Sequence, residues 1–394
     1  MFDPFAPGFT DDPYPHYARL RDAAPAYRHP LGFWLLSRYD DVARLQRSPH
    51  SVDERDLTEI PAWKRDGDVP VQANRPMRGL SMLDQNPPGH TRLRRLVAQA
   101  FTRGSVEALA PRVGALVDAA LDRVAATGDV LGELAFPLPF TVISELLGTP
   151  PVEHARLREL TGTLVRALEP LSSPALQAEI RAANDELTEI TRELIGRKRA
   201  HPGDDLITGL LAARHGDEML TDDELVAQVM FLYIAGHETT VNLLANGILA
   251  LVRNPAQARL LRDDPALAAN AVEELVRYDT SVHLMRRITV EPLEVRGERI
   301  PAGSFVVACL ASANRDAAFW GPDADEVRLD RPDAHRNVSF GAGIHHCLGA
   351  ALARLEARTA FTRFVHRFPA AEVADLRWNG RLNVRGPAEL RLSV

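Results

Sequence analysis

A cysteine in a glycine-rich segment is the first candidate for chemistry. Cys347 lies in residues 340–349, FGAGIHHCLG, directly before the apolar helical pattern ALARLEARTAFTRFV. A thiolate at this position can ligate a metal, because loop amides and the N-terminus of the following helix temper its negative charge. Cys347 is therefore the residue on which the interpretation of the sequence depends. The other cysteine, Cys309, lies in the apolar run VVACL and is interpreted as a small buried hydrophobe.

A second candidate is a polar motif inside the longest helical pattern. Apolar spacing predicts a helix over residues 222–253, which begins with the capping box of Thr221 and Glu224. At 1.5 Å per residue this helix would span on the order of 48 Å. Its centre, residues 235–240, reads AGHETT and should be buried. Glu238 and the neighbouring hydroxyls could form a proton path beside a flat ligand, and a core helix with satisfied polar groups is an equally good interpretation.

Two charge motifs are weak when each is taken alone. Glu274 and Arg277 are three residues apart on one predicted helical face, a spacing that most often gives an ordinary surface ion pair. His90 and Arg94 are four residues apart and would project together from the start of another helix, where they could bind carboxylates. A solvated basic face is the commoner explanation for such a pair. Neither motif by itself indicates a function.

The composition is typical of one large globular unit. The 394 residues are 45% hydrophobic and 25% charged, so the chain can bury a large core. A formal net charge of -7 argues against a general nucleic-acid binder, which normally needs a concentrated basic face. Two cysteines are too few for a secreted disulfide framework, and we read neither a signal peptide nor a membrane span. We therefore expect a cytoplasmic protein.

Helical periodicity dominates the chain, and sheet is a minor component. Apolar residues recur at three- and four-residue spacing over residues 14–24, 91–101, 106–126, 175–199 and 348–365. Short strands are predicted at residues 33–36 and after residue 280, where LEVRGERIPAG reads as two strands followed by SFVVACL. Residues 48–89 have little periodicity and read as a long loop of the kind that covers binding sites. Its apolar members that could line a pocket are Trp63, Met77, Leu80, Met82 and Leu83.

Together, these motifs resemble one family over essentially the whole chain. FGAGIHHCLG at 340–349, AGHETT at 235–240, EELVR at 273–277 and HTRLR at 90–94 follow the order of the cytochrome P450 family, the haem-thiolate monooxygenases. SANRD at 312–316 and EVRLD at 326–330 also fall in the expected order. The resemblance implies a single cytochrome P450 domain, residues 1–394, that is mainly α with a minor β lobe. Many bacterial relatives carry a proline after the Gly-Ala that follows the cysteine, and this chain does not.

The resemblance also implies a cofactor site and a catalytic pair. Cys347 would be the axial ligand of the iron of haem b, and Glu238 and Thr239 would deliver protons to bound oxygen. Arg287 is preferred over the adjacent Arg286 as a ligand of the haem propionates. Gly341 and Gly343 would permit the tight loop that points amides at the sulfur. The implied cofactor-binding residues are His90, Arg94, Ala235, Arg287, Phe340, Gly341, His345 and Cys347.

Further residues receive structural or substrate roles from the same resemblance. Glu274, Arg277 and Arg328 would form a structural charge triad. His346 is interpreted as a packing or surface residue. The residues implied to line the substrate pocket are Phe231, Ile234, Ala235, His283, Met285 and Val384. That lining suits a medium-sized hydrophobic molecule of secondary metabolism, which would be hydroxylated or epoxidised.

Electrons must come from outside, because no flavin or iron–sulfur region can be placed in the chain. The resemblance implies an external ferredoxin and ferredoxin reductase as donors, and we expect a monomer. A small acidic ferredoxin would meet a basic patch on the cysteine side. The arginines expected in that patch are Arg95, Arg103, Arg354 and Arg358.

Three rival interpretations stay open from the sequence. The first keeps the haem-thiolate centre in a peroxygenase, an aryl-coupling oxidase or an isomerase; a peroxide user would typically lack the Glu238–Thr239 pair. The second is a haem-binding sensor without turnover. The third is an α-helical enzyme that uses Cys347 as a nucleophile with a histidine base, which leaves the basic pairs and the glycine loop unexplained.

Overall fold

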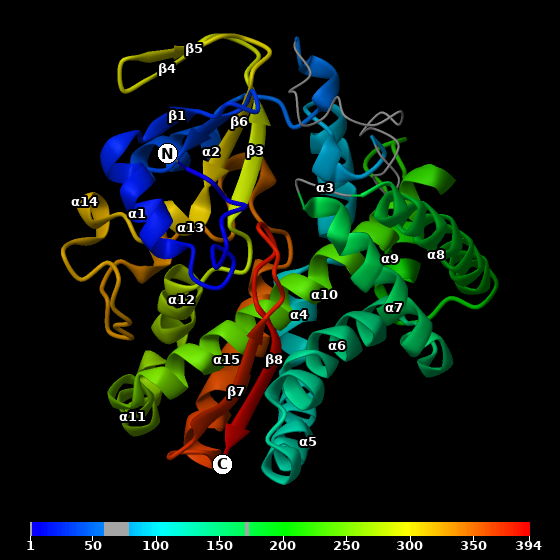
Figure 1. Ribbon diagram of the computed structural model, residues 1–394. Helices are drawn as coiled ribbons and strands as arrows, with labels where there is room; N and C mark the ends of the chain where they lie inside the picture. Colours follow the sequence, from blue (N-terminus) through cyan, green and yellow to red (C-terminus); the bar gives the residue numbers. More distant parts are fainter. Residues whose placement is uncertain (1, 59–78, 170–172) are drawn as a thin grey trace.

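The computed structural model describes residues 2–58, 79–169 and 173–394 (Figure 1). Helices dominate these residues and short strands form a smaller part, which confirms the predicted mainly α fold with a minor β component. Trp63 and Met77, two of the predicted loop residues, lie outside the described residues. Within the described ranges, no helix is both long enough and apolar enough to cross a membrane.

The helical elements, in chain order, have the following bounds. The helices are α1 (Tyr14–Ala23), α2 (Tyr39–Arg47), α3 (Gly89–Ala100), α4 (Arg103–Ala108), α5 (Ala110–Thr127), α6 (Pro137–Leu147), α7 (His154–Leu164), α8 (Pro174–Ala200), α9 (Leu206–Ala212), α10 (Asp222–Arg253), α11 (Pro255–Asp263), α12 (Ala268–Tyr278), α13 (Leu310–Ala313), α14 (Ala317–Trp320) and α15 (Ala350–Arg367). Short 3-10 segments include η4 (Met82–Asp84), η7 (Val165–Leu168) and η10 (Gly343–His345).

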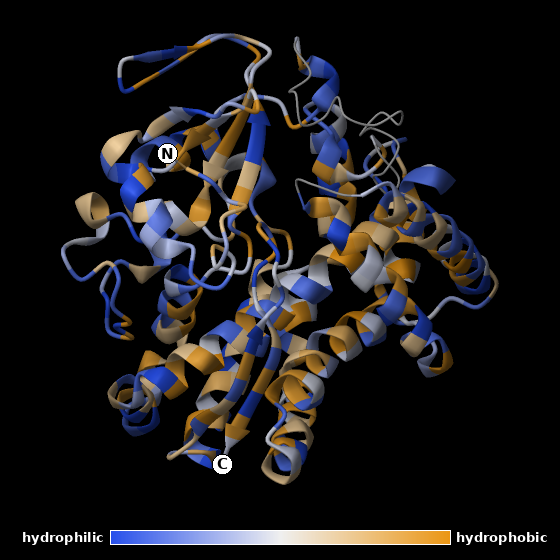
Figure 2. Ribbon diagram, viewed as in Figure 1, coloured by the Kyte–Doolittle hydropathy of each residue, from blue (hydrophilic) through white to orange (hydrophobic). Residues whose placement is uncertain are grey.

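Helix α10 runs through the middle of the helical part and begins and ends where the sequence predicts (Figure 1). The capping box forms, because the Thr221 side chain accepts from the amide of Glu224 at 3.2 Å and Glu224 accepts from the amide of Thr221 at 2.9 Å. The helix packs against α6, α8, α12 and α15, so most of its side chains are buried. In Figure 2 the outer side of α8 is largely hydrophilic, whereas apolar residues dominate α6.

The crossing of α10 and α15 is close because a glycine lies at the contact. A Cβ atom on Gly247 would overlap the ring of Phe361, which is buried in the main apolar cluster. This close approach fixes α15 relative to α10 and therefore fixes the loop that precedes α15.

The strands form three small sheets. The four-stranded sheet has the order β1 (Ala26–Arg28), β2 (Trp34–Leu36), β6 (Phe305–Cys309) and β3 (Leu284–Ile288), with β2 parallel to β6 and the other pairs antiparallel. The hairpins are β4 (Leu293–Val295) with β5 (Glu298–Ile300) and β7 (Glu372–Trp378) with β8 (Pro387–Ser393). Arg296 and Gly297 both have positive φ, as a two-residue hairpin turn requires, and this confirms the predicted pair of short strands.

One predicted helix is interrupted in the structure. Residues 106–126 were expected to form a single helix, and the structure divides them into α4 and α5 at Leu109. Pro111 explains the break, because proline lacks the amide hydrogen and is tolerated only in the first turn of a helix.

A buried charge network surrounds the carboxylate of Glu274. Arg277 donates to it at 2.6 Å and Arg331 donates to both of its oxygens at 3.1 Å, and none of the three side chains is more than 5% exposed. The predicted third member, Arg328, is wrong. Its backbone amide contacts Glu274, while its guanidinium is 40% exposed and pairs with Asp323. The chain turns at this point, since the amide of Arg331 bonds to the carbonyl of Arg328, and the turn directs Arg331 inward instead.

The network extends to the cysteine loop through Asn314. Arg277 donates to the Asn314 carbonyl at 2.7 Å. The Asn314 side chain in turn accepts from the amide of Val338 at 2.9 Å and donates to Ser339 Oγ at 2.7 Å. Residues directly ahead of the loop at 340–349 are therefore held by α12.

We expect the two arginines to differ sharply in their contribution to stability. Arg331→Met should lower the free energy of unfolding by about 3–5 kcal/mol, because it leaves the buried Glu274 charge incompletely paired. Arg328→Met should cost less than about 1 kcal/mol, because that side chain makes surface ion pairs. Urea unfolding followed by circular dichroism measures both. Equal losses would contradict the assignment of Arg331 to the network.

Candidate active site

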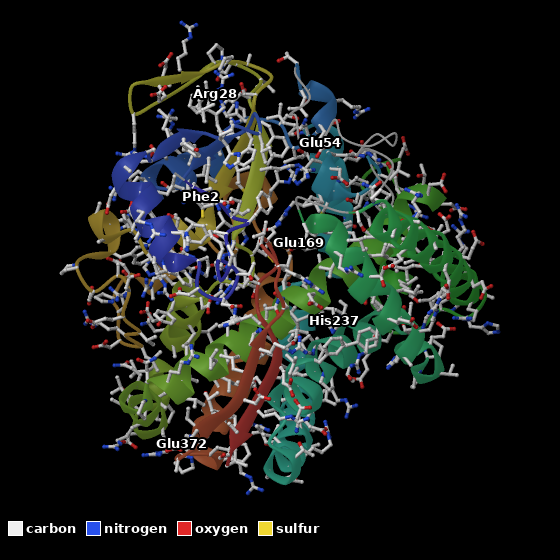
Figure 3. All side chains as sticks on the ribbon, in the orientation of Figure 1. Phe2, Arg28, Glu54, Glu169, His237 and Glu372 are labelled. Carbon is white, nitrogen blue, oxygen red and sulfur yellow. The ribbon has the colours of Figure 1, made fainter. Side chains whose placement is uncertain are left out.

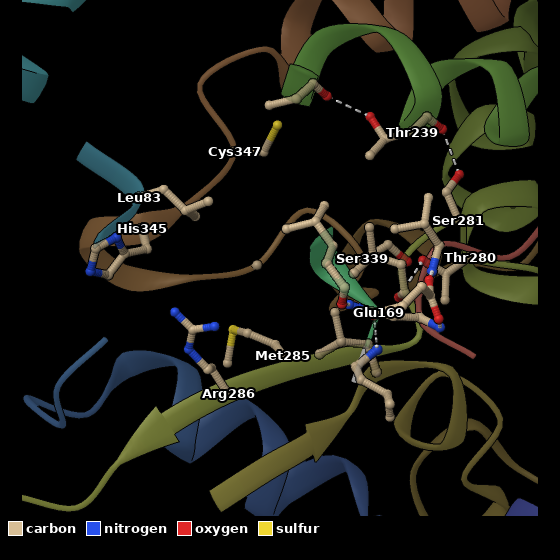
Figure 4. Close-up of a pocket in the computed structure, with 18 of the residues that line it drawn as sticks. Leu83, Glu169, Thr239, Thr280, Ser281, Met285, Arg286, Ser339, His345 and Cys347 are labelled. Atoms are coloured by element: carbon tan, nitrogen blue, oxygen red, sulfur yellow. Dashed lines mark hydrogen bonds between the residues drawn. The ribbon is translucent and has the colours of Figure 1, made fainter. Parts of the chain in front are cut away.

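A partly open cavity of about 1110 Å³ lies where α10, β3 and the loop before α15 meet. Figure 4 shows Cys347 and His345 on the loop, Thr239 on α10 and Met285 on β3 around this space. Most of the lining side chains are apolar. The site is therefore an apolar chamber into which a small number of polar groups project.

The cysteine loop is closed by a backbone bond and two glycines. The amide of Cys347 donates to the carbonyl of Phe340 at 2.8 Å. Gly341 and Gly343 have φ of 71° and 69°, in the left-handed region that favours glycine. A Cβ atom on Gly343 would lie 3.1 Å from the carbonyl oxygen of Gln46, so neighbouring backbone would also have to move.

The thiol of Cys347 faces the cavity. Its exposed surface opens into that space, while the protein around it raises the pKa of the thiol through desolvation. Amides of Gly349 and Ala350 at the start of α15, together with the charges of Arg354 and Arg94, act in the opposite direction and lower this pKa. These groups are suited to stabilising a thiolate once a cation takes the proton's place.

Four basic groups gather at one wall of the cavity without a carboxylate between them. They are His90 and Arg94 of α3, Arg287 of β3 and His345 of the loop. The rings of His90 and His345 are 4.3 Å apart between centroids. His90 is 2% exposed, and neither of its nitrogens has a hydrogen-bond partner among the described residues. Arg287 is 3% exposed and its Nε is likewise unpartnered.

Burial lowers the pKa values of all four groups, and nearby positive charges lower those of the two histidines further. Desolvation lowers the pKa of Arg287 to about 10. Burial, followed by the charges of Arg287, His90 and Arg94, lowers the pKa of His345 to about 3. Burial also lowers the pKa values of His90 and Arg94. Such a cluster is stabilised when anionic oxygens accept from its donors, so it fits a ligand that carries carboxylates.

The neighbouring Arg286 differs from Arg287 in its partners. Its guanidinium lies 3.2 Å from a carboxylate oxygen of Glu54 and 3.6 Å from one of Asp84. Arg287 donates only to the carbonyl of Arg286 within the described residues. Arg287, unlike Arg286, therefore has no carboxylate partner among the described residues.

At the centre of α10 the polar side chains point in different directions. Thr239 lines the cavity and its hydroxyl donates to the Ala235 carbonyl at 2.8 Å (Figure 4). Glu238 does not line the cavity and pairs instead with Arg381 at 2.8 Å. His237 is packed against Phe136 and Phe140, and burial lowers its pKa to about 4. The hydroxyl of Thr239 is thus the member of the predicted pair that a ligand would meet first.

Most of the predicted pocket residues line the cavity. Phe231, Ala235, Met285 and Val384 do so, as do Phe340 and Gly341 from the predicted cofactor set. Of the loop residues, Met82 and Leu83 line the cavity and Leu80 does not.

Two predicted pocket residues, Ile234 and His283, are wrong. The lining positions of α10 include 231, 235 and 239, four residues apart, and Ile234 lies off that stripe in the cluster around α6 and α8. His283 is fully buried with its Nδ1 3.1 Å from the hydroxyl of Tyr17, and burial lowers its pKa to about 3. Its ring occupies the interior beside α1 instead of the cavity.

Several residues that line the cavity have no role predicted from the sequence. Glu169 follows η7, and Phe2, Phe5 and Phe9 come from the N-terminal segment, so all are distant in sequence from the motifs. Glu356 of α15 also lines the cavity, and burial raises its pKa to about 8. A signal for Glu356 was present, since an acid interrupts the apolar face of a helix that follows the cysteine.

Comparisons with known proteins agree with this geometry. The family model described as Cytochrome P450 matches residues 164–373. The chain is 41% identical to Cytochrome P450 107B1 of Saccharopolyspora erythraea, over 98% of this chain and 96% of that protein. It is 41% identical to the Vitamin D(3) 25-hydroxylase of Pseudonocardia autotrophica, over 94% and 90% of the two chains.

Similar relationships hold for PikC and for solved structures. The cytochrome P450 monooxygenase PikC of Streptomyces venezuelae is 39% identical over 96% of this chain and 90% of its own. The structure of P450BioI, in complex with an acyl carrier protein ligated to hexadec-9Z-enoic acid, superposes with a TM-score of 0.89 at 32% identity, covering 98% of each chain. Myxobacterial CYP267B1, in complex with myristic acid, gives 0.88 at 37% identity, covering 99% of this chain and 98% of that one.

We expect replacement by alanine to change the free energy of unfolding in opposite directions at two glycines. Gly343→Ala should destabilise the protein by about 1–3 kcal/mol, because a side chain is strained at positive φ and meets the backbone near Gln46. Gly196→Ala, in the exposed interior of α8 where nothing lies within 4 Å, should stabilise it by about 0.5–1 kcal/mol. The shift in urea midpoint at constant m-value reports both. Destabilisation of the same size at both sites would show that the loop imposes no special conformation.

Proposed function

The chain belongs to the cytochrome P450 family of haem b monooxygenases, and from this premise we propose that it hydroxylates or epoxidises a medium-sized hydrophobic small molecule with electrons from an external ferredoxin. One observation carries the proposal. A cavity-facing thiol, a basic cluster without carboxylates and a threonine hydroxyl surround the same apolar chamber.

The residues around the chamber fit haem b. Cys347 would ligate the iron, and the unpartnered donors of His90 and Arg287, with Arg94 and His345, would bind the propionates. Ala235, Phe340 and Gly341 would contact the ring. When bound, the haem supplies the reducible iron at which dioxygen is activated.

The overall reaction for hydroxylation is R–H + O₂ + 2 e⁻ + 2 H⁺ → R–OH + H₂O. Two protons must therefore reach the oxygen from solvent. In our proposal Thr239 Oγ1 offers a proton on the cavity side, and the adjacent Glu238, whose ion pair with Arg381 reaches solvent, resupplies it. The apolar surroundings keep bulk water from competing with the substrate.

The lining supports a hydrophobic substrate. Phe231 of α10, Met285 of β3 and Val384 of the C-terminal segment present apolar surface to the chamber. Relatives named for their reactions include PikC, the Vitamin D(3) 25-hydroxylase and Nocardicin C N-oxygenase of Nocardia uniformis. A molecule of secondary metabolism is therefore our proposal for the substrate class.

Docking of an acidic ferredoxin would use the basic side of the cysteine loop. Arg95 of α3 and Arg358 of α15 are exposed. Arg354 pairs with Glu273 and lies over the ring of Phe340, so it has less charge to offer. The side chain of Arg103 lies outside the described part of the structure.

Cys347→Ser tests the proposed function directly. The variant should lose ferredoxin-driven product formation and the thiolate-type absorption of the reduced carbon monoxide complex, because a serine oxygen does not replace the thiolate donor. Cys309→Ala is the matched control, since Cys309 is fully buried away from the cavity. Product formation by the serine variant at the parental rate would overturn the proposal.

Charge reversal at the exposed arginines tests the docking side. Arg95→Glu with Arg358→Glu should lower kcat/KM for ferredoxin by about tenfold at low salt, with a smaller difference at high salt. Arg28→Glu, at an exposed position on β1, should have no such effect. Steady-state reduction assays at two ionic strengths measure the change, and an identical loss for Arg28→Glu would rule out a specific patch.

A further inference from the structure

The ion pair of Glu238 joins α10 to a turn near the C-terminus. Arg381 Nη1 lies 2.8 Å from Glu238 Oε1, and the side chains are 22% and 13% exposed. Among the described residues, Arg381 is the ion-pair partner of Glu238. The pair therefore reaches solvent at one end, while the next residue of α10, Thr239, lines the cavity.

Arg381 belongs to a turn that is stabilised by hydrogen bonds of the Asn379 side chain. Asn379 accepts from the amide of Arg381 at 3.0 Å and donates to the carbonyl of Val384 at 3.0 Å. The amide of Asn379 also bonds to the carbonyl of Gly386. Residues 379–386 thus form a defined unit, and the backbone position of Arg381 is fixed within it.

A carboxylate from a distant part of the chain anchors the same turn. Glu169, labelled in Figure 3, follows η7 and accepts from three successive amides, those of Leu382, Asn383 and Val384, at 2.8, 3.1 and 3.0 Å. The Asn383 side chain donates in the reverse direction to the carbonyl of Leu168 at 3.1 Å.

The turn is also connected to the backbone of Thr239 through Ser281. The amide of Arg385 bonds to the carbonyl of Ser281 at 2.9 Å, and Ser281 Oγ donates to the carbonyl of Thr239 at 2.7 Å (Figure 4). Leu382, Asn383 and Val384 line the cavity. Residues 379–386 therefore pair with the Glu238 side chain, line the space where a substrate would lie, and connect to the Thr239 backbone through Ser281.

We propose that Arg381 is a positioning residue for Glu238 and that Glu169 positions Arg381 by fixing the turn. This inference rests on the proposed role of Glu238 in resupplying protons. A glutamate on a helix surface samples several rotamers, and a planar guanidinium restrains it to one. Held this way, the carboxylate stays between solvent and Thr239, where it can pass protons inward.

The test uses the holoenzyme with ferredoxin, reductase and a probe substrate. Vitamin D3, testosterone and myristic acid are the probes screened, and one that gives a spin-state shift is taken forward. Arg381→Gln should lower the product formed per NADPH roughly tenfold, with a matching rise in peroxide (O₂ + 2 e⁻ + 2 H⁺ → H₂O₂), because a mispositioned acid delivers protons slowly. Arg381→Lys should recover most of the loss, and the spectral Kd for the probe should change little.

Peroxide-driven turnover separates this role from a merely structural one. In R–H + H₂O₂ → R–OH + H₂O the oxidant carries both protons, so none has to come from solvent. Arg381→Gln should therefore lose much less of this rate than of the NADPH-driven rate, and an equal loss of both would overturn the proposed role. Arg377→Gln removes an exposed arginine of the preceding strand, β7, and serves as the control that leaves product per NADPH unchanged.

Hydrogen exchange tests the proposed role of Glu169 without depending on turnover. Glu169→Ala should speed hydrogen exchange of the amides of residues 382–384 severalfold and lower product per NADPH in the same direction as Arg381→Gln. Unchanged exchange in this variant would overturn the proposed role of Glu169.

Glu238→Gln distinguishes the proposed proton role of Glu238 from the proposed positioning role of Arg381. If this variant forms product per NADPH as the parent does, the proton role of Glu238 itself fails. If it is impaired while Arg381→Gln matches the parent, the inference about Arg381 is overturned and the proposed function stands. If the double variant is no worse than Glu238→Gln alone, Arg381 acts through Glu238 as proposed.

Discussion

The structure depends above all on one constraint, the cluster of His90, Arg94, Arg287 and His345 at one wall of the cavity, which has no carboxylate partner among the described residues. His90 and Arg287 are almost completely buried with donors that have no partner in the described residues. Burying such groups is costly unless anionic oxygens accept from them. The haem of this family carries two carboxylates, so the cluster and the cofactor complete one another. The folded chain is therefore arranged for a ligand that supplies the missing charge.

The position of the thiol depends on contacts far from the cavity. Glu274 and Arg277 of α12, with Arg331, hold Asn314, and Asn314 holds the residues directly before the cysteine loop. Gly247 lets α15 approach α10, which places the amides that face the sulfur. A network that does not contact the cavity thus determines where Cys347 lies, and this separates the residues that support the site from those that react there.

In the proposed mechanism, one segment of the cavity wall takes part in both substrate contact and proton supply. Residues 382–384 line the chamber, and the residue before them pairs with Glu238. A substrate packed against this wall would therefore press on the segment that orients the acid. The anchoring carboxylate of Glu169 bonds directly to this segment, although it lies more than two hundred residues away in sequence. The wall that sets substrate fit and the group proposed to set proton supply are parts of one segment.

The sequence by itself determined the family, the bounds of α10, the loop glycines and the candidate thiolate, because each is encoded in a short contiguous pattern of spacing or turn chemistry. Tertiary structure alone decided which charged groups pair across the chain. Arg331 replaces Arg328 beside Glu274 because a turn reverses the direction of the side chain. His283 lies outside the cavity lining because its ring contacts the hydroxyl of Tyr17 from the N-terminal helix. Glu169 and Arg381 carry no local motif, and their partners become neighbours only when distant segments fold together.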